Sequence, residues 1–238
     1  MESLKGKHVL VVGATGGIGG KLVKLLNSSG AHVFITGRNK EKLAATAAEN
    51  GIPSGRAFVL DVADEESVNN TIQQVLGQVP SIDILVNAAG IGIIKTIDQL
   101  SSAEFIQTLQ TNLVGSFFLV KAVLPKMKEL KKGLIINIPG ILGKVPMAGA
   151  AAYSASKYGL VGMMQSIREE IKRTDIRITN LFLGGVDSPF WDTIDLRVQR
   201  EKMVVAEEAA KAIWFLCQQP VSGVVSEMVL QPFNHQAI

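Results

Sequence analysis

The chain has 238 residues, of which 47% are hydrophobic and 19% charged, so it can bury a sizeable core and is not disordered in general. Its net charge is only +3, without a basic block, and we predict neither a nucleic-acid nor an anionic membrane partner. The single cysteine, Cys217, excludes an internal disulfide framework and a multi-thiolate zinc site, and the three scattered histidines suggest no metal motif. No apolar run reaches the ~20 residues that span a bilayer, and no secretory cleavage pattern follows the start. We therefore expect a soluble cytoplasmic protein.

Short β-rich runs alternate with longer helical stretches along the whole chain. The predicted strands are 8–13, 32–37, 57–62, 83–88, 133–138, 176–182 and 227–232. The predicted helices are 17–28, 39–49, 64–77, 101–130, 151–173 and 205–218, and Gly30 and Gly51 suit left-handed helix ends. Several strands are almost continuously apolar, which is typical of strands covered by helices on both faces. The pattern predicts an α/β fold, a doubly wound, Rossmann-like parallel sheet of about seven strands, in a single domain over 1–238.

A glycine-rich turn follows the first predicted strand and opens the first helix, in VVGATGGIGGKL. Gly13, Gly17 and Gly19 allow a tight turn, close approach of a pyrophosphate, and close packing of helix on strand. The helix then offers unpaired N–H groups to the phosphates. The turn is not a Walker A loop, because Gly20-Lys21 is followed by Leu22. A glycine-rich turn that serves packing alone is the alternative interpretation.

The end of the second predicted strand bears on the choice of nucleotide. An NAD-binding unit needs an acidic side chain there to accept hydrogen bonds from the ribose hydroxyls, and this strand ends in Thr36-Gly37-Arg38 instead. A guanidinium can pair with a 2′-phosphate bidentately, which favours NADP(H). A solvated surface arginine is the alternative.

Tyr153 and Lys157 stand four residues apart in a predicted helix and so share one face. A free phenol has a pKa near ~10, and a neighbouring ammonium together with an oxidised nicotinamide should lower that pKa. The tyrosine could then exchange a proton with a carbonyl or alcohol oxygen while a hydride moves. Packing plus a solvated charge is the alternative for this pair when it is considered alone.

Together, GATGGIG, the NAAG at 87–90 and the YSASK at 153–157 resemble the short-chain dehydrogenase/reductase family over essentially the whole chain. The resemblance implies a nicotinamide cofactor, reversible carbonyl–alcohol chemistry, and Tyr153, Lys157 and Asn112 as catalytic residues. With the glycine turn and Arg38, it assigns the cofactor site to Gly13, Thr15, Gly16, Gly17, Ile18, Gly19, Arg38, Asp61, Val62, Asn87, Ala88, Ala89, Gly90, Tyr153, Lys157, Gly184, Val186 and Ser188.

The sequence also departs from the family pattern. The family places a serine, which helps bind the substrate carbonyl, thirteen residues before the tyrosine, and that position is Gly140 here. Leu183 replaces a loop proline, and SEMVLQPF replaces the usual glycine-rich ending. Because a hydroxyl donor acts where charge develops, we expect Gly140→Ser to raise kcat/KM by up to about 10²-fold, provided that the loop geometry permits.

Apolar residues are expected to form the substrate walls: Ile91, Ile93, Ile94, Ile141, Leu142, Met147, Phe190 and Trp191. Lys144 is a candidate contact for an acidic group, and the segment of about 186–204 is a candidate lid. Alternatively, the apolar residues simply cover the sheet ends. Helix 151–173 has small residues near its start, which permit close approach of another helix. Members of the family commonly pair this helix across a two-fold axis, so the resemblance implies a homodimer or homotetramer.

The leading hypothesis is an oxidoreductase that transfers a hydride between NADP(H) and a small, apolar carbonyl or alcohol, with activity reduced by Gly140. The alternative is an NADP(H)-binding sensor or regulatory protein with little turnover. Dehydratase or epimerase chemistry would use the same tyrosine and lysine and stays open. The sequence does not reveal the specific substrate or the direction of the reaction.

Overall fold

A seven-stranded parallel sheet runs through the molecule, in the order β3-β2-β1-β4-β5-β6-β9. The computed structural model describes residues 1–233. The strands of this sheet are β1 (His8–Val12), β2 (His32–Gly37), β3 (Ala57–Val59), β4 (Ile84–Asn87), β5 (Lys132–Asn137), β6 (Asp175–Leu183) and β9 (Glu227–Leu230). The predicted α/β, doubly wound fold is therefore confirmed.

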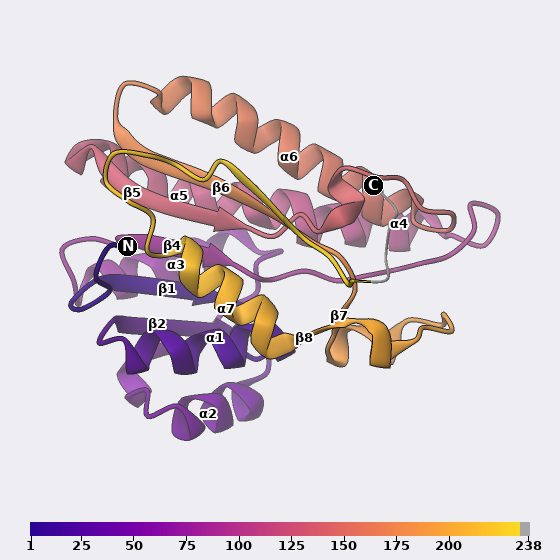
Figure 1. Cartoon of the computed structure of the whole chain (residues 1–238), viewed down its shortest axis with the longest axis horizontal. Helices are drawn as coiled ribbons and strands as arrows, with labels where there is room; N and C mark the ends of the chain where they lie inside the picture. Colours follow the sequence, from indigo (N-terminus) through magenta and orange to yellow (C-terminus); the bar gives the residue numbers. More distant parts are fainter. Residues whose placement is uncertain (234–238) are drawn as a thin grey trace.

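Helices cover both faces of the sheet (Figure 1). One layer holds α1 (Gly17–Ser28), α2 (Lys40–Glu49) and α7 (Ala206–Leu216), and the other holds α3 (Glu65–Leu76), α5 (Gly115–Leu130) and α6 (Ala151–Ile171). Strand alternation sends Val9 and Val11 into the first core and Leu10 and Val12 into the second. Both faces of the strands are buried, which explains their nearly continuous apolar sequences.

The strand order reverses between β1 and β4, which are adjacent although two strands separate them in the chain. Chains leaving the carboxyl ends of these two strands turn to opposite faces of the sheet, and a crevice opens between them. Val12 pairs with Thr36 on one side and with Asn87 on the other, so all three residues lie at the same level at this edge. Some of the predicted cofactor residues lie at this crevice.

The predicted helix 101–130 is divided in the structure. It consists of α4 (Ser102–Leu109), a π-helical turn (Gln110–Val114) and α5, because the turn inserts an extra residue between the two α-helices. The predicted strand 57–62 ends early, at Val59, since the Asp61 side chain accepts a hydrogen bond from the Ala63 amide and starts a turn. Gly30 and Gly51 have φ of 77° and 64°, as predicted.

The segment between β6 and α7, which includes the predicted lid of about 186–204, contains regular secondary structure. Its ends form a short parallel pair, β7 (Val186–Asp187) with β8 (Val204–Val205), separate from the main sheet. Between them lie two 3-10 turns, Pro189–Thr193 and Arg200–Lys202. Figure 1 shows this segment at the end of the molecule toward which the main strands point.

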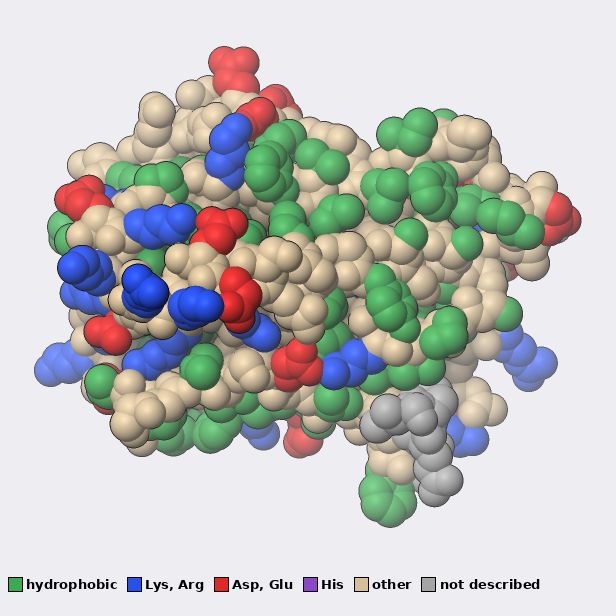
Figure 2. Space-filling model, turned by 90° about the horizontal axis from the view of Figure 1, so that it is seen from above, with side chains coloured by type: hydrophobic (Ala, Val, Ile, Leu, Met, Phe, Trp, Pro, Cys, Tyr) green, Lys and Arg blue, Asp and Glu red, His purple; other side chains and the backbone are tan. Residues whose placement is uncertain are grey.

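On the face drawn in Figure 2, the two ends of the molecule differ in the kind of side chains they expose. Figure 2, seen from above, shows acidic and basic side chains gathered at the left end, and more hydrophobic side chains at the right end, where β7 lies in Figure 1. Among the helices of residues 1–233, none has the length and apolar character needed to cross a membrane.

Candidate active site

The glycine turn packs against the end of β4 without room for side chains. Gly13 has a φ of +83°, and a Cβ there would lie 2.8 Å from the Ala89 amide nitrogen. A Cβ on Gly19 would collide with the Gly13 carbonyl oxygen. These two positions therefore require glycine, and they bring the amino end of α1 against the strand ends.

A pocket at the crevice is lined by residues from the ends of β1, β2 and β4 and from the loops that follow them. It is formed by Val12, Gly13, Thr15, Gly16, Thr36, Gly37, Arg38, Leu60, Val62, Ala88, Ala89, Gly90, Ile91 and Thr111. Eight of these are predicted cofactor residues: Gly13, Thr15, Gly16, Arg38, Val62, Ala88, Ala89 and Gly90. The other lining residues include Thr111, whose place depends on the π turn that no sequence pattern indicated.

Several predicted cofactor residues lie beside the pocket rather than in its lining. Asn87 lies beneath it and donates a 2.8 Å hydrogen bond to Ser116 Oγ in α5. Asp61 is exposed and closes its own turn. Gly17 touches the segment that follows β7, since a Cβ there would lie 2.9 Å from Ser188 Cβ and from Pro189 Cδ.

The remaining predicted cofactor residues outside the lining have packing positions. Gly184 lies against Pro232, Gly19 is buried in the glycine turn, and Val186 is a buried residue of β7. Ile18 is half-buried and packs on the core beneath α1.

The predicted catalytic residues come together at the Gly90 end of the pocket. A Cβ on Gly90 would lie 3.2 Å from Asn112 Oδ1 and 3.5 Å from Lys157 Nζ. Asn112, in the π turn, is bonded to both backbone groups of Ile91, at 2.9 Å each. Lys157 Nζ donates to the Ile138 carbonyl oxygen at 3.1 Å and lies 5.4 Å from the centre of the Tyr153 ring. The structure therefore brings Asn112, Tyr153 and Lys157 together, and their catalytic roles stay predictions.

Burial sets the protonation of the pair. It lowers the pKa of Lys157 to about 8, which leaves this ammonium mostly protonated at neutral pH. Burial also raises the pKa of Tyr153, because the phenolate loses hydration. Tyr153 is therefore a neutral phenol at neutral pH, and the lowering of its pKa expected beside an oxidised nicotinamide stays a prediction.

Gly140 lies beside the tyrosine hydroxyl in a conformation that other residues avoid. Its φ is 67° and its ψ is 172°, a region essentially reserved for glycine. A Cβ there would nevertheless have room, with the Leu183 carbonyl oxygen at 3.5 Å and Tyr153 Oη at 3.9 Å. The backbone conformation, and not a lack of space, opposes a serine at this position.

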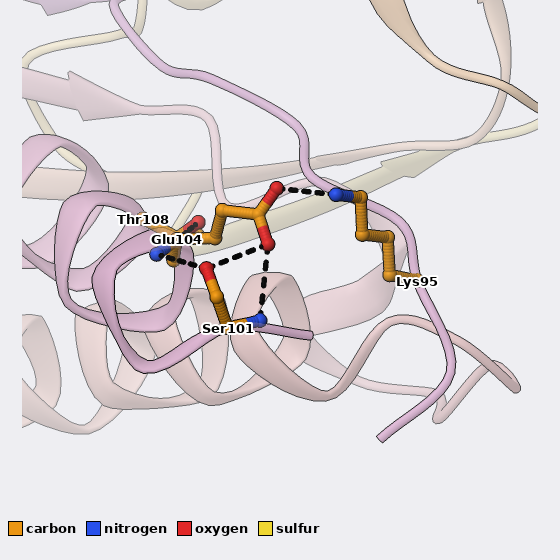
Figure 3. Close-up of polar contacts among 4 residues, drawn as sticks. All are labelled: Lys95, Ser101, Glu104 and Thr108. Carbon is orange, nitrogen blue, oxygen red and sulfur yellow. Dashed lines mark hydrogen bonds and ion pairs between the residues drawn. The ribbon is translucent and has the colours of Figure 1, made fainter. Parts of the chain in front are cut away.

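An ion pair holds the loop that follows β4. Lys95 Nζ lies 2.5 Å from Glu104 Oε1, and the Glu104 carboxylate also accepts hydrogen bonds from the Ser101 amide and hydroxyl at the start of α4 (Figure 3). The Lys95 hydrogen bond, followed by those from Ser101, lowers the pKa of Glu104 to about 2. The Lys95 amide bonds to the Gly149 carbonyl oxygen just before α6, so this network joins the loop after β4 to two helices.

Lys144 is not a free cation. Its ammonium lies 2.6 Å from Glu227 Oε2 in β9 and 4.3 Å from the centre of the Phe182 ring. The predicted contact between Lys144 and an acidic substrate group would require this pair to break.

The pocket residues fit a nicotinamide dinucleotide. The Thr36 hydroxyl is buried in the lining and has no hydrogen-bond partner within residues 1–233, which leaves a polar atom for a ligand. Gly37 packs closely against Thr15, because a Cβ there would lie 2.6 Å from Thr15 Cγ2, so this strand end has no room for an acidic side chain. The lining includes the Arg38 guanidinium and no carboxylate.

Comparison with known proteins gives consistent similarities. The sequence model of the family described as short chain dehydrogenase matches residues 7–198. A 3-oxoacyl-(acyl-carrier-protein) reductase of Rickettsia felis is 32% identical, with 96% of each chain covered. An alcohol dehydrogenase from the archaeon Thermococcus sibiricus, complexed with 5-hydroxy-NADP, superimposes with a TM-score of 0.86 at 26% identity, covering 97% of this chain and 98% of the other. A metagenomic short-chain oxidoreductase in complex with NADP gives 0.83 at 30% identity, covering 98% and 100%.

Proposed function

The chain belongs to the short-chain dehydrogenase family and is a nicotinamide-dependent oxidoreductase, and from this premise we propose that it transfers a hydride between NADP(H) and a small, apolar carbonyl or alcohol. One observation carries the proposal: Lys157 and Asn112 adjoin Gly90, at the end of a pocket suited to a dinucleotide, and Tyr153 lies next to Lys157. Arg38 in the lining, together with relatives solved with NADP, supports NADP(H) over NAD(H).

In the proposed reaction NADP(H), when bound, supplies or accepts the hydride. Tyr153 Oη donates a proton to the carbonyl oxygen of the substrate, and its raised pKa keeps it in the proton-donating form at neutral pH. The Lys157 ammonium stabilises the phenolate left behind, and its hydrogen bond to Ile138 fixes its position. Asn112 holds the loop at Ile91 beside them.

The surroundings of Tyr153 support an apolar substrate. Seven of the eight predicted wall residues are half-buried, namely Ile91, Ile93, Ile94, Ile141, Leu142, Phe190 and Trp191, whereas Met147 is exposed. Lys144, the cation suggested for an acidic group, is already paired with Glu227. A neutral ketone or alcohol therefore suits this end of the pocket better than a phosphorylated sugar.

Gly140 favours a second candidate, an NADP(H)-binding regulatory protein with little turnover, because it brings no hydroxyl to the substrate oxygen. A panel of ketones and aldehydes with NADPH distinguishes the two, with Tyr153→Phe as the matched variant. The enzyme hypothesis predicts carbonyl-dependent NADPH oxidation that Tyr153→Phe reduces by about 10²-fold or more while NADPH still binds. NADPH binding without turnover of any carbonyl would favour the regulatory protein.

A further inference from the structure

A half-buried phenyl ring in the segment of about 186–204, the predicted lid, lies against Tyr153. The centre of the Phe190 ring is 5.9 Å from that of Tyr153, at an interplanar angle of 55°. The ring also meets Gly92, where a Cβ would collide with Phe190 Cζ. Phe190 thus fills the space between the proton donor and the loop after β4, which is the space that a substrate next to Tyr153 must share.

The lid also reaches the nucleotide side of the site. Ser188 and Pro189 lie against Gly17, at the amino end of α1, and Ile194 is buried near Gly92. Residues 188–194 therefore cover both the glycine turn and the tyrosine, at the end of the molecule where β7 lies (Figure 1). A small displacement of these residues would move Phe190 relative to Tyr153.

One arginine ties both ends of the lid together. Arg200 Nε lies 2.7 Å from Asp187 Oδ1, and another of its guanidinium nitrogens lies 2.8 Å from Asp192 Oδ1. Its third nitrogen donates to the Ser188 carbonyl oxygen. The planar guanidinium thus binds residues before and after Phe190, a geometry that an ammonium could not reproduce.

We propose that Phe190 sets the size of the substrate that this protein accepts, and that Arg200 is the positioning residue that holds Phe190 over Tyr153. The inference deepens the proposed function and rests on it. Substrates with a compact group at the carbonyl fit beside the ring, whereas a bulky aryl group competes with the ring for the same space. Removing the ring, or displacing it from the Gly92 side, should shift the preference toward bulky ketones.

The first experiment measures kcat/KM for a small methyl ketone and for a naphthyl ketone, with saturating NADPH. Phe190→Ala should raise the ratio of the bulky to the small ketone by about tenfold or more. Gly92→Ala should raise it too, because the new methyl group occupies the place of the ring edge, and Gly92 does not have a left-handed φ. An unchanged ratio in both folded variants overturns the role of Phe190.

The second experiment follows the lid without turnover. In a Trp214→Phe background, Trp191 is the sole tryptophan, and its indole donates to the Val186 carbonyl oxygen inside the lid. Arg200→Gln should increase acrylamide quenching of Trp191, and ~1 M salt should move the unsubstituted lid in the same direction. The control Arg197→Gln changes an exposed lid arginine with no ion pair within residues 1–233 and should leave quenching unchanged. Equal quenching in both variants overturns the role of Arg200.

Different results would refute the proposed function and the inference about Phe190. If the wild type turns over no carbonyl, the proposed function is wrong and the size preference falls with it. If it turns over small ketones and neither Phe190→Ala nor Gly92→Ala changes the size ratio, the oxidoreductase assignment stands and the inference about Phe190 is wrong.

Discussion

The backbone conformation of Gly140 limits how the absence of a serine hydroxyl at this position can be tested. A serine would carry strain of about 1–3 kcal/mol in the glycine-only region, so its effect on activity mixes strain with chemistry. Gly140→Ala has the same strain without the hydroxyl and is the matched control. We expect both variants to lose stability, and Gly140→Ser to exceed Gly140→Ala in kcat by about tenfold or more.

Steady-state kinetics of these two variants, with urea unfolding as the check on folding, make this comparison. Equal kcat values in two folded variants would mean that a hydroxyl at position 140 does not reach the substrate oxygen. In that case the expectation of a gain up to about 10²-fold, formed from the sequence alone, fails as well.

Arg38 is the residue on which the choice of nucleotide depends. Arg38→Ala should weaken NADPH binding by about tenfold to a hundredfold, because it removes a bidentate contact to the 2′-phosphate. NADH lacks this phosphate, so its binding should change little. The matched control is Lys40→Ala, which removes an exposed cation two residues away. Titration calorimetry with both nucleotides measures the effect, and equal affinities of the wild type for NADPH and NADH would refute the assignment. Adding an aspartate at position 37 is a poor test, because its Cβ would meet Thr15.

At the scale of elements, the amino end of α4 carries a pH-dependent contribution to stability. Glu104 has its pKa lowered to about 2 by Lys95 and Ser101, so its stabilising effect is complete above its ordinary value near 4.5 and is lost as the pH falls toward 2. Glu104→Gln should therefore lower the Tm at neutral pH, and the difference from wild type should shrink between pH 4.5 and 2.

Thermal unfolding over this pH range tests the network in Figure 3. Glu41→Gln, in the first turn of α2, provides the control, since Glu41 forms no ion pair within residues 1–233. A difference in Tm that stays constant down to pH 2 would contradict the proposed ionic contribution of Glu104.

Most elements follow from local sequence, and the exceptions have physical reasons. Apolar runs bounded by turn residues predict the seven strands of the sheet. Asn39 and Asp64, at the predicted starts of two helices, are the residues that cap those helices in the structure. The π turn at 110–114 leaves no periodic signal, since one inserted residue in a long helix changes the phase and not the composition. The sequence therefore predicts Asn112 by resemblance and misses Thr111 in the pocket. Tertiary contacts likewise decide that Lys144 pairs with Glu227.

At the scale of the whole molecule, we predict a homodimer or homotetramer. Large apolar side chains remain exposed on α4, α5 and α6, namely Ile106 at 63%, Phe117 at 43% and Tyr158 at 44%. A second copy of the chain would cover such side chains, in keeping with the symmetric assemblies common among soluble proteins. Light scattering after size exclusion should give two or four times the chain mass of 25.5 kDa, and a particle of the single-chain mass at micromolar concentration would refute the prediction.

The central claim is that a hydride passes between a nicotinamide and a carbonyl carbon beside Tyr153. Its most direct test uses NADPH deuterated at the transferred position of the nicotinamide ring, an accepted ketone, and mass spectrometry of the alcohol. The account predicts one deuterium at the carbinol carbon of the product, with formation of labelled alcohol largely abolished in Tyr153→Phe. NADPH oxidation without label in the alcohol, or labelled alcohol formed equally fast by Tyr153→Phe, would contradict it.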